Sequence, residues 1–458
     1  MADKIWAAAA LLSSGWAESV ELGIDNRGDI ESVSSKRAYT SGDRVAVLIP
    51  AIPNVHSHAH QRAMSGLGER AGLSGDAAKD SFWTWRKVMY HYLERIQPEH
   101  LYHIAAQLYV EMLKAGYSCV GEFQYLHHDL DGQAYDNRAE MSLQCMQAAK
   151  QVGLGFTALP VLYRYGGFDS AEPLAGQKRF LNDIDGFVEI VKILQLESQS
   201  DANTAVGIAP HSLRAISQEL LSEVMASLDN LAAIHVHIAE QTKEVDDCLN
   251  WSGKRPLEWL FEHFEVNQSW CLIHATHMTA AETTMMARSG CVAGLCPTTE
   301  ANLGDGFFNA VDYFQQQGRW AIGSDSHISI DPVEELRWLE YGQRLVTRNR
   351  NLLVSANAAN TGRNLLDGAL QGGARACGRK IGSIETGYRA DLLVLDDQHP
   401  RLYGRKQDDL LDSWIFSGNQ NLVKDVYVGG KKVITNGFHA DQESIAVNYR
   451  NTLDQLAG

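Results

Sequence analysis

The sequence predicts an α/β protein: a (β/α)8 barrel of the TIM type with a small β-sandwich domain built from both termini. Short apolar runs rich in β-branched residues alternate with longer helical patterns between about residues 48 and 385, and eight such runs can be counted. Both ends of the chain consist instead of short alternating strands separated by Gly, Asn and Asp turns. We therefore expect the barrel at residues 49–384 and the β-sandwich domain at residues 1–48 and 385–458.

The N-terminal segment MADKIWAAAALLSSGW resembles a short signal peptide. Its apolar run is brief, however, and Asp3 reduces the positive charge that such a peptide needs. We expect this segment to be the first strand of the folded protein.

Eight segments are the predicted strands of the barrel. They are AVLIPAIPNVHSH (46–58), YSCVGEF (117–123), GLGFTALPVLY (153–163), TAVGIAPHS (204–212), LAAIHVHIAE (231–240), SWCLIHATHM (269–278), GCVAGLCPTT (290–299) and RWAIGSDSH (319–327). Helices are predicted between them, for example over residues 99–116 and 280–290, where apolar residues keep helical spacing and Gly116 and Gly290 provide C-terminal stops.

Composition excludes several classes of function. The 458 residues are 45% hydrophobic and 21% charged, as in soluble globular proteins, and the formal net charge of -16 argues against a nucleic-acid or membrane partner. Seven cysteines without a C-x-x-C pair indicate a reducing compartment, so a cytoplasmic protein is expected. A homodimer is the prior expectation among closed symmetric assemblies.

Ionisable side chains gather where the predicted strands end. In a barrel of this kind the active site lies at the C-terminal ends of the strands. The candidates in chain order are His56 and His58, then Glu122, Gln124 and Tyr125, then His211 and Arg214, then His237 and Glu240, then His274 and His277, and finally Asp325 and His327.

Three imidazoles and one carboxylate suit a borderline divalent cation, most simply Zn²⁺. The predicted ligands are His56, His58, His237 and Asp325. His235 is an alternative to His237, which is preferred because it lies nearer the end of its strand. We expect His60 to lie beyond the rim of the barrel, in a loop or supporting position.

With these residues in order, the sequence resembles the amidohydrolase superfamily. The resemblance rests on the H-x-H that ends strand one, the single histidines that end strands five and six, the Asp that ends strand eight, and the return segment IGSIETGYRADLLVLDD (381–397). It covers essentially the whole chain. It implies a metal-dependent hydrolase with a barrel of the amidohydrolase kind.

The sequence also resembles the deaminase branch of that superfamily, because HIAE places Glu240 three residues after His237. Members with two metals commonly bridge them with a lysine ending strand four, but this strand ends in APHSLRA, so one metal is expected. We assign Glu240 to proton transfer at the substrate nitrogen, and His274 and Asp325 to the water proton and the tetrahedral intermediate; which of the last two is the base stays open. Glu240 could instead be a surface carboxylate that opens the next helix.

The expected substrate is a small dicarboxylate. Arg86 and Arg214 lie near the predicted rim of the barrel, and the planar guanidinium group of an arginine matches a carboxylate. The segments NVHSHAHQRAMSGLGE, SFWTWRKVMY, GEFQYLHHD and APHSLRA resemble deiminases that hydrolyse N-formimino-L-glutamate in histidine degradation. His60 departs from HSHAFQ, the commoner form of the first motif. The resemblance implies that the glutamate portion of the substrate is surrounded by Gln61, Arg86, Tyr125, His211 and Arg214.

Two other interpretations compete. A purine, pterin or other ring deaminase of the same superfamily would share the metal and the acid and base groups and differ only in the pocket. A non-enzymatic metal-binding barrel would have no use for Glu240 and His274. A serine hydrolase is disfavoured because no G-x-S-x-G motif occurs.

Overall fold

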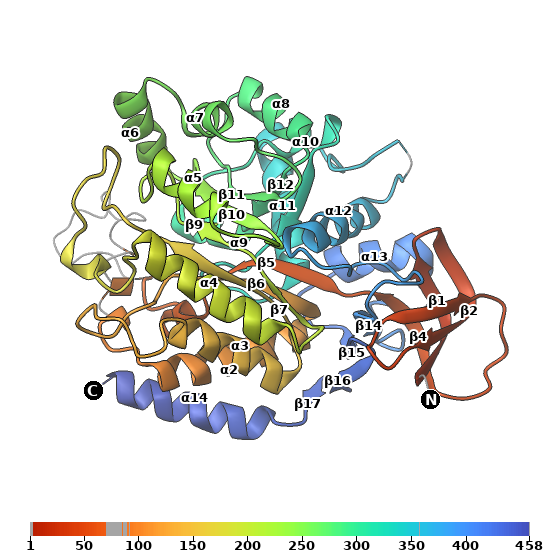
Figure 1. Cartoon of the computed structure of the whole chain (residues 1–458). Coiled ribbons are helices and arrows are strands. Elements are labelled where there is room, and N and C mark those ends of the chain that lie inside the picture. The colour runs from red at the N-terminus through yellow and green to blue at the C-terminus, as the bar shows by residue number, and fades with distance from the viewer. Residues whose placement is uncertain (1–2, 70–84, 86–88, 91, 357, 458) are drawn as a thin grey trace.

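The protein is described from a computed structural model, in which a barrel of parallel strands lies beside a sheet formed by the two ends of the chain (Figure 1). The structure describes residues 3–69, 85, 89–90, 92–356 and 358–457. None of the helices described there is both long enough and apolar enough to cross a membrane.

All eight segments predicted as barrel strands contain one. The strands are β5 (Ile52–Ser57), β6 (Tyr117–Gln124), β7 (Gly155–Leu162), β8 (Thr204–Val206), β10 (Ile234–Ile238), β11 (Trp270–His274), β12 (Val292–Leu295) and β13 (Arg319–Ile322). They form two parallel arcs, β5-β6-β7-β8 and β10-β11-β12-β13. Isolated parallel bridges between Ser57 and Asp325 and between Ile208 and Ile234 join the arcs at both seams, and β9 (Ala209–Pro210) pairs with β7.

Burial explains why these strands were visible as apolar runs. Every residue of β6 and β7 is buried, since one side of each strand lines the barrel interior and the other meets helices.

The helices surround the barrel. The predicted helices at 99–116 and 280–290 are confirmed as α2 (Pro98–Ala115) and α8 (Ala280–Ser289), and each is followed by a glycine with positive φ, 109° at Gly116 and 79° at Gly290. The others are η1 (Ala59–Met64), α3 (Glu140–Val152), η3 (Ala175–Gln177), α4 (Ile184–Ser198), α5 (Gln218–Ala226), α6 (Thr242–Ser252), α7 (Pro256–His263), α9 (Pro297–Leu303), α10 (Ala310–Gln315), α11 (Pro332–Thr347), α12 (Thr361–Ala376), α13 (Gln407–Phe416) and α14 (Gln442–Ala457).

The two termini share one mixed sheet of eight strands. Its order is β17-β16-β15-β14-β4-β1-β2-β3. The strands are β1 (Asp3–Leu12), β2 (Gly15–Ile24), β3 (Ile30–Ser34), β4 (Asp43–Pro50), β14 (Leu392–Leu395), β15 (Val423–Val428), β16 (Lys431–Thr435) and β17 (Phe438–His439). The N-terminal segment is a strand, as predicted, and the antiparallel pair β4 and β14 joins the two ends of the chain.

The first predicted barrel run proved to be two strands. Residues 46–58 begin in β4 of the terminal sheet and continue after Ala51 as β5 of the barrel. The chain therefore passes from one sheet to the other almost without interruption.

The C-terminal helix α14 lies against the barrel rather than the terminal sheet, beneath α2 in Figure 1. Arg95 donates to the carbonyl of Leu456 at 2.8 Å, and Lys114 donates to Gln442 at 3.1 Å. The last part of the chain thus supports the barrel from outside.

Candidate active site

Three strand ends bring the four predicted metal ligands together. His56 is the next-to-last residue of β5 and His58 directly follows that strand, His237 lies on β10, and Asp325 follows β13. The Nε2 atoms of His56 and His237 are 3.0 Å apart. Asp325 Oδ1 is 3.4 Å from His56 Nε2 and 3.3 Å from His58 Nε2.

Hydrogen bonds behind the rings fix which imidazole nitrogens face the centre. His58 Nδ1 lies 2.9 Å from the carbonyl of Phe123, and His237 Nδ1 lies 3.0 Å from the carbonyl of His211. A carbonyl oxygen only accepts, so both Nδ1 atoms carry the proton and both Nε2 atoms point their lone pairs inward.

This arrangement suits a cation. Burial lowers the pKa of His56 to about 3 despite Asp325, and it also lowers the pKa of His237. Neutral imidazoles whose lone pairs meet a carboxylate repel one another unless a positive charge lies among them. Two overlapping groups of donor atoms within 4.8 Å of one another, His56 with His58 and His237, and His56 with His274 and Asp325, could hold a metal ion.

Two other histidines lie close to these predicted ligands. His235 shares the face of β10 with His237, but it lies one repeat deeper and its Nε2 is 2.7 Å from the carbonyl of Ala376. The prediction that His60 lies beyond the rim is wrong, because η1 turns the chain inward and buries it. His60 Nε2 lies 2.8 Å from the hydroxyl of Tyr125.

Glu240 and His274 face the same centre. His274 Nε2 lies 3.8 Å from Glu240 Oε1 and 3.7 Å from Asp325 Oδ2. Glu240 is 6% exposed, so the alternative of a surface carboxylate is wrong. Burial raises the pKa of Glu240 to about 7, although the charge of His274 opposes the rise.

Glu300 is a site residue that the sequence analysis missed. Its Oε1 lies 3.3 Å from His274 Nδ1 and accepts a hydrogen bond from the Cys296 amide at 2.9 Å. Burial alone would lower the pKa of His274, but Glu240, the hydrogen bond with Glu300, and Asp325 raise it to about 10. The available signal was a carboxylate shortly after the seventh strand segment, in CPTTE.

The backbone at this centre is unusual. His274 and Asp325 have φ of 68° and 45°, in the left-handed region that residues other than glycine rarely adopt. Such conformations cost about 1–3 kcal/mol each and concentrate at functional sites. The fold thus holds both side chains in place against a local preference.

Most of the predicted substrate residues line one pocket above this centre. The pocket includes Gln61, Tyr125, His211 and Arg214 together with Glu240 and Asp325. The positive charge of Arg214 acts on Glu240, whose pKa it lowers after the larger effects of burial and His274. Arg86 lies outside the described residues.

Other side chains at the strand ends point elsewhere. Glu122 accepts hydrogen bonds from Ser57 at 2.6 Å and Tyr109 at 3.1 Å, behind the barrel wall, and burial raises its pKa to about 7. Gln124 accepts from the Leu126 amide at 3.1 Å. His327 lies 3.2 Å from the Ser57 hydroxyl, and so it supports β5 from behind.

The strand-end cluster of metal-binding side chains and the split terminal sheet are typical of an amidohydrolase. The chain belongs to the amidohydrolase family, whose model matches residues 47–433. A crystal structure of an amidohydrolase from Brucella melitensis matches it with a TM-score of 0.94 and 44% identity over 100% of both chains. The predicted family and fold class are confirmed.

Among individual proteins, the chain is similar to the formimidoylglutamate deiminase of Pseudomonas aeruginosa, with 48% identity over 455 residues and 99% of each chain. It is 24% identical to the 5'-deoxyadenosine deaminase of Methanopyrus kandleri, over 94% of this chain and 92% of that one. An adenosine deaminase structure from Xanthomonas campestris with bound zinc, at 22% identity and a TM-score of 0.80 over 100% and 99% of the chains, shares the fold.

Proposed function

We propose that this chain hydrolyses N-formimino-L-glutamate to N-formyl-L-glutamate and ammonia, in histidine degradation. The observation that carries the proposal is the group formed by Glu240, His274 and Asp325, in which His274 lies within 3.8 Å of both carboxylates beside a cluster suited to a metal. The substrate is inferred from the similarity to a formimidoylglutamate deiminase along 99% of the chain.

The reaction needs protons moved at two atoms. Water adds to the carbon of the C=N group, the bond from that carbon to the terminal nitrogen breaks, and both water protons end on the departing nitrogen. We assign the transfer to nitrogen to Glu240, which lies in the pocket with a pKa near neutrality. Asp325, a carboxylate, takes the water proton. His274, whose pKa Glu240 and Glu300 raise to about 10 despite burial, stays protonated and stabilises the negative charge that develops on oxygen.

The donor set of three imidazoles and a carboxylate supports a single Zn²⁺ held by His56, His58, His237 and Asp325. When bound, such a metal supplies positive charge that lowers the pKa of water to about 7. We also propose a cytoplasmic location, because all seven cysteines are free and buried, which supports a reducing compartment. The proposed assembly is a homodimer.

The pocket supports an acidic substrate. Arg214 lines it beside His211, and Tyr125, which follows β6, and Gln61, which lies in η1, add hydrogen-bonding groups. Arg86 is proposed as the second guanidinium from the resemblance alone. Together the two arginines would hold the two carboxylates of the substrate.

A ring deaminase is the second candidate. Trp85, Tyr90, Tyr163 and Phe180 also line the pocket and could stack on a base. Charge separates the two candidates. Arg214→Met should raise KM strongly for a dicarboxylate and change it little for a neutral ring.

The test is ammonia release by metal-analysed protein, measured in parallel on N-formimino-L-glutamate and on aminopurines and aminopyrimidines. We expect turnover of the dicarboxylate only. Glu240→Gln should lower kcat by about 10²–10⁴-fold with unchanged metal content. Glu197→Gln, an exposed residue of α4, is the matched control. Full activity of Glu240→Gln would contradict the assigned role, and ring turnover would contradict the substrate.

A further inference from the structure

A second cavity lies at the opposite end of the barrel from the metal centre. Its volume is about 670 Å³, and it is bordered by the end of β1, the start of β13, one side of α12 and the return segment 378–388. Arg319, the first residue of β13, marks the N-terminal end of the barrel strands. This cavity therefore shares no wall with the catalytic groups.

Positive charge dominates the lining of this cavity. Five cations line it against two carboxylates, in a chain whose formal net charge is -16. The cations are Arg319, Arg363, Arg375, Arg379 and Lys380, and the carboxylates are Asp367 and Glu385.

Two of the cations already have acidic partners. Arg363 donates to Asp367 at 2.7 Å and lies 3.4 Å from Asp408. Arg379, whose side chain is 5% exposed, lies 3.9 Å from the buried carboxylate of Asp391. These ion pairs hold α12 and the return segment in place.

The other three cations of the lining have no acidic partner among the described residues. Arg319, Arg375 and Lys380 form no salt bridge within the described part of the chain, and Glu385 forms none there either. The three positive charges exceed the single negative charge of Glu385 by two. Arg375 donates to Gln268 at 2.6 Å, a neutral acceptor, and Lys380 Nζ lies 5.1 Å from the ring centroid of Tyr388.

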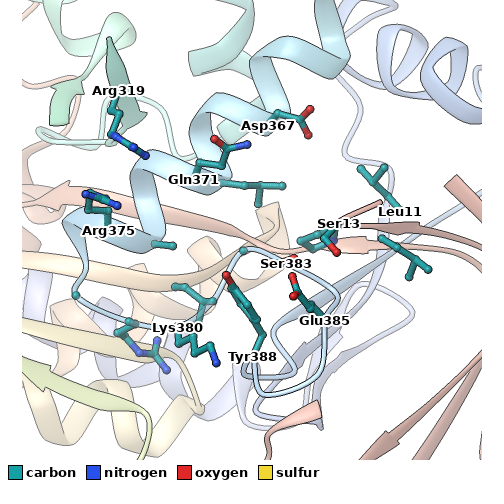
Figure 2. A pocket seen from close by; sticks show the side chains of 18 of the residues that line it. Leu11, Ser13, Arg319, Asp367, Gln371, Arg375, Lys380, Ser383, Glu385 and Tyr388 are labelled. Atoms are coloured by element: carbon teal, nitrogen blue, oxygen red, sulfur yellow. The ribbon is translucent and has the colours of Figure 1, made fainter. Parts of the chain in front are cut away.

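The arrangement of the side chains concentrates this charge. Figure 2 shows Arg319 and Arg375 together at one end of the cavity and Glu385 with Tyr388 at the other. Burial lowers the pKa of Arg375, and the like charge of Arg319 lowers it further. An anion between them would relieve that repulsion.

Neutral groups complete a lining suited to a small molecule. Gln371, Ser13, Ser383 and Tyr388 offer hydrogen-bond donors, while leucines of β1 and α12 form an apolar part. The volume falls within the range of about 300–1,000 Å³ that is usual for small-molecule sites. Gly382 brings the return segment close to α12, since a Cβ there would lie 2.8 Å from the carbonyl of Leu370.

We propose that this cavity binds a small oxyanion with at least two negative charges, of the phosphate ester or polycarboxylate class. Arg319 and Arg375 hold one charged group between their guanidiniums, and Lys380 meets the rest of the molecule near Tyr388. This site is separate from catalysis and does not depend on the proposed substrate.

The test uses the metal-loaded protein and two probes, inorganic phosphate and tricarballylate, with sodium chloride at matched ionic strength as the reference. Calorimetric titration gives Kd and stoichiometry, and thermal unfolding gives the shift in Tm. We expect at least one probe to bind one to one and to raise Tm above the chloride reference. The probe that binds more tightly identifies the chemical class.

Variants locate the binding. Arg319→Gln combined with Arg375→Gln should weaken Kd at least about tenfold, because both charge-assisted contacts are lost. Lys380→Gln, a milder change at an exposed side chain, should weaken it by a smaller factor. Arg288→Gln, which removes the same charge from an exposed position on α8, should leave Kd within about twofold.

Two results would overturn the proposal. One is that neither probe binds better than chloride. The other is that a probe binds but its Kd is the same in the Arg319 and Arg375 double variant and in Lys380→Gln as in the unaltered protein, which would place that probe elsewhere.

Discussion

His60 is a buried residue one step behind the substrate pocket. Its Nε2 lies 2.8 Å from the Tyr125 hydroxyl, which also accepts a hydrogen bond from Gln61 at 3.2 Å. These two contacts fix the position of a hydroxyl that lines the pocket. If Tyr125 binds the substrate as proposed, His60 acts on it through this hydroxyl.

We expect His60→Phe to raise KM for N-formimino-L-glutamate about fivefold, as loss of a hydrogen bond worth about 1 kcal/mol would do. The measurement is a double-mutant cycle with Tyr125→Phe. In the Tyr125→Phe background the second change should have no further effect on KM. Equal effects of His60→Phe in both backgrounds would show that it acts independently of Tyr125.

Glu300 contacts Nδ1 of His274, whereas Nε2 of the same ring faces Glu240 and Asp325. Glu300→Gln keeps an oxygen that can accept from His274 Nδ1 and the Cys296 amide but removes the charge. We expect kcat to fall by about 10–100-fold, KM to change by less, and metal content to stay constant. Steady-state kinetics and metal analysis check this. A KM effect alone would contradict a role in orienting His274.

The residues of the site differ in how far the sequence predicts them. The rule that the active site lies at the C-terminal ends of the barrel strands predicts six of them, and the structure brings these six together: His56, His58, His237, Glu240, His274 and Asp325. Their roles as ligands and catalysts stay predictions. Glu300 and the burial of His60 depend on how α9 and η1 turn after their strands, which strand periodicity does not describe.

At the scale of elements, α9 depends on a carboxylate from α11. Glu335 is fully buried and accepts hydrogen bonds from the Thr298 amide at 2.9 Å and the Thr298 hydroxyl at 2.5 Å. These contacts satisfy the N-terminal end of α9, the helix that carries Glu300.

We expect Glu335→Ala to lower the free energy of unfolding by about 1–3 kcal/mol, because buried donors lose their partner. It should also lower kcat, since α9 positions Glu300. Thermal unfolding and ammonia release measure the two effects. Glu197→Ala, at an exposed position of α4, should change neither. An unchanged Tm in Glu335→Ala would contradict this account of α9.

The strands of the barrel were predictable because nearly all are buried on both faces and stand out as apolar runs. The division of residues 46–58 was not, because β4 and β5 are both extended and mostly buried. Only the change of partner separates them: β4 pairs with β14, more than 300 residues later, and β5 pairs with β6. Pairing at that separation leaves no local signal.

At the scale of the whole molecule, the metal centre links strands from both arcs of the barrel, β5 from one and β10 from the other, with Asp325 beyond β13. Without a metal, the converging lone pairs and the carboxylate repel one another. We expect metal removal by a chelator to lower Tm and abolish ammonia release. Added Zn²⁺ should restore both. A metal ion that binds only the folded protein, at a free concentration of about 1,000 times its Kd, raises the free energy of unfolding by about 4 kcal/mol.

The control for metal removal is His237→Asn, which lacks one proposed ligand. The chelator should lower its Tm by less than that of the unaltered protein. If the chelator leaves the Tm of the unaltered protein unchanged, metal binding at this cluster does not stabilise the fold.

The passage of the chain from β4 to β5 through Ala51 has a mechanical consequence. The amide of Ala51 donates to the carbonyl of Asp391, so the junction itself is clamped by the C-terminal part of the terminal sheet. From that hydrogen bond to His56 the chain runs through β5, a short strand whose pairing with β6 contains two register irregularities. The terminal sheet, which contributes no side chain to the catalytic group, is thereby tied directly to the strand that carries His56 and leads to His58.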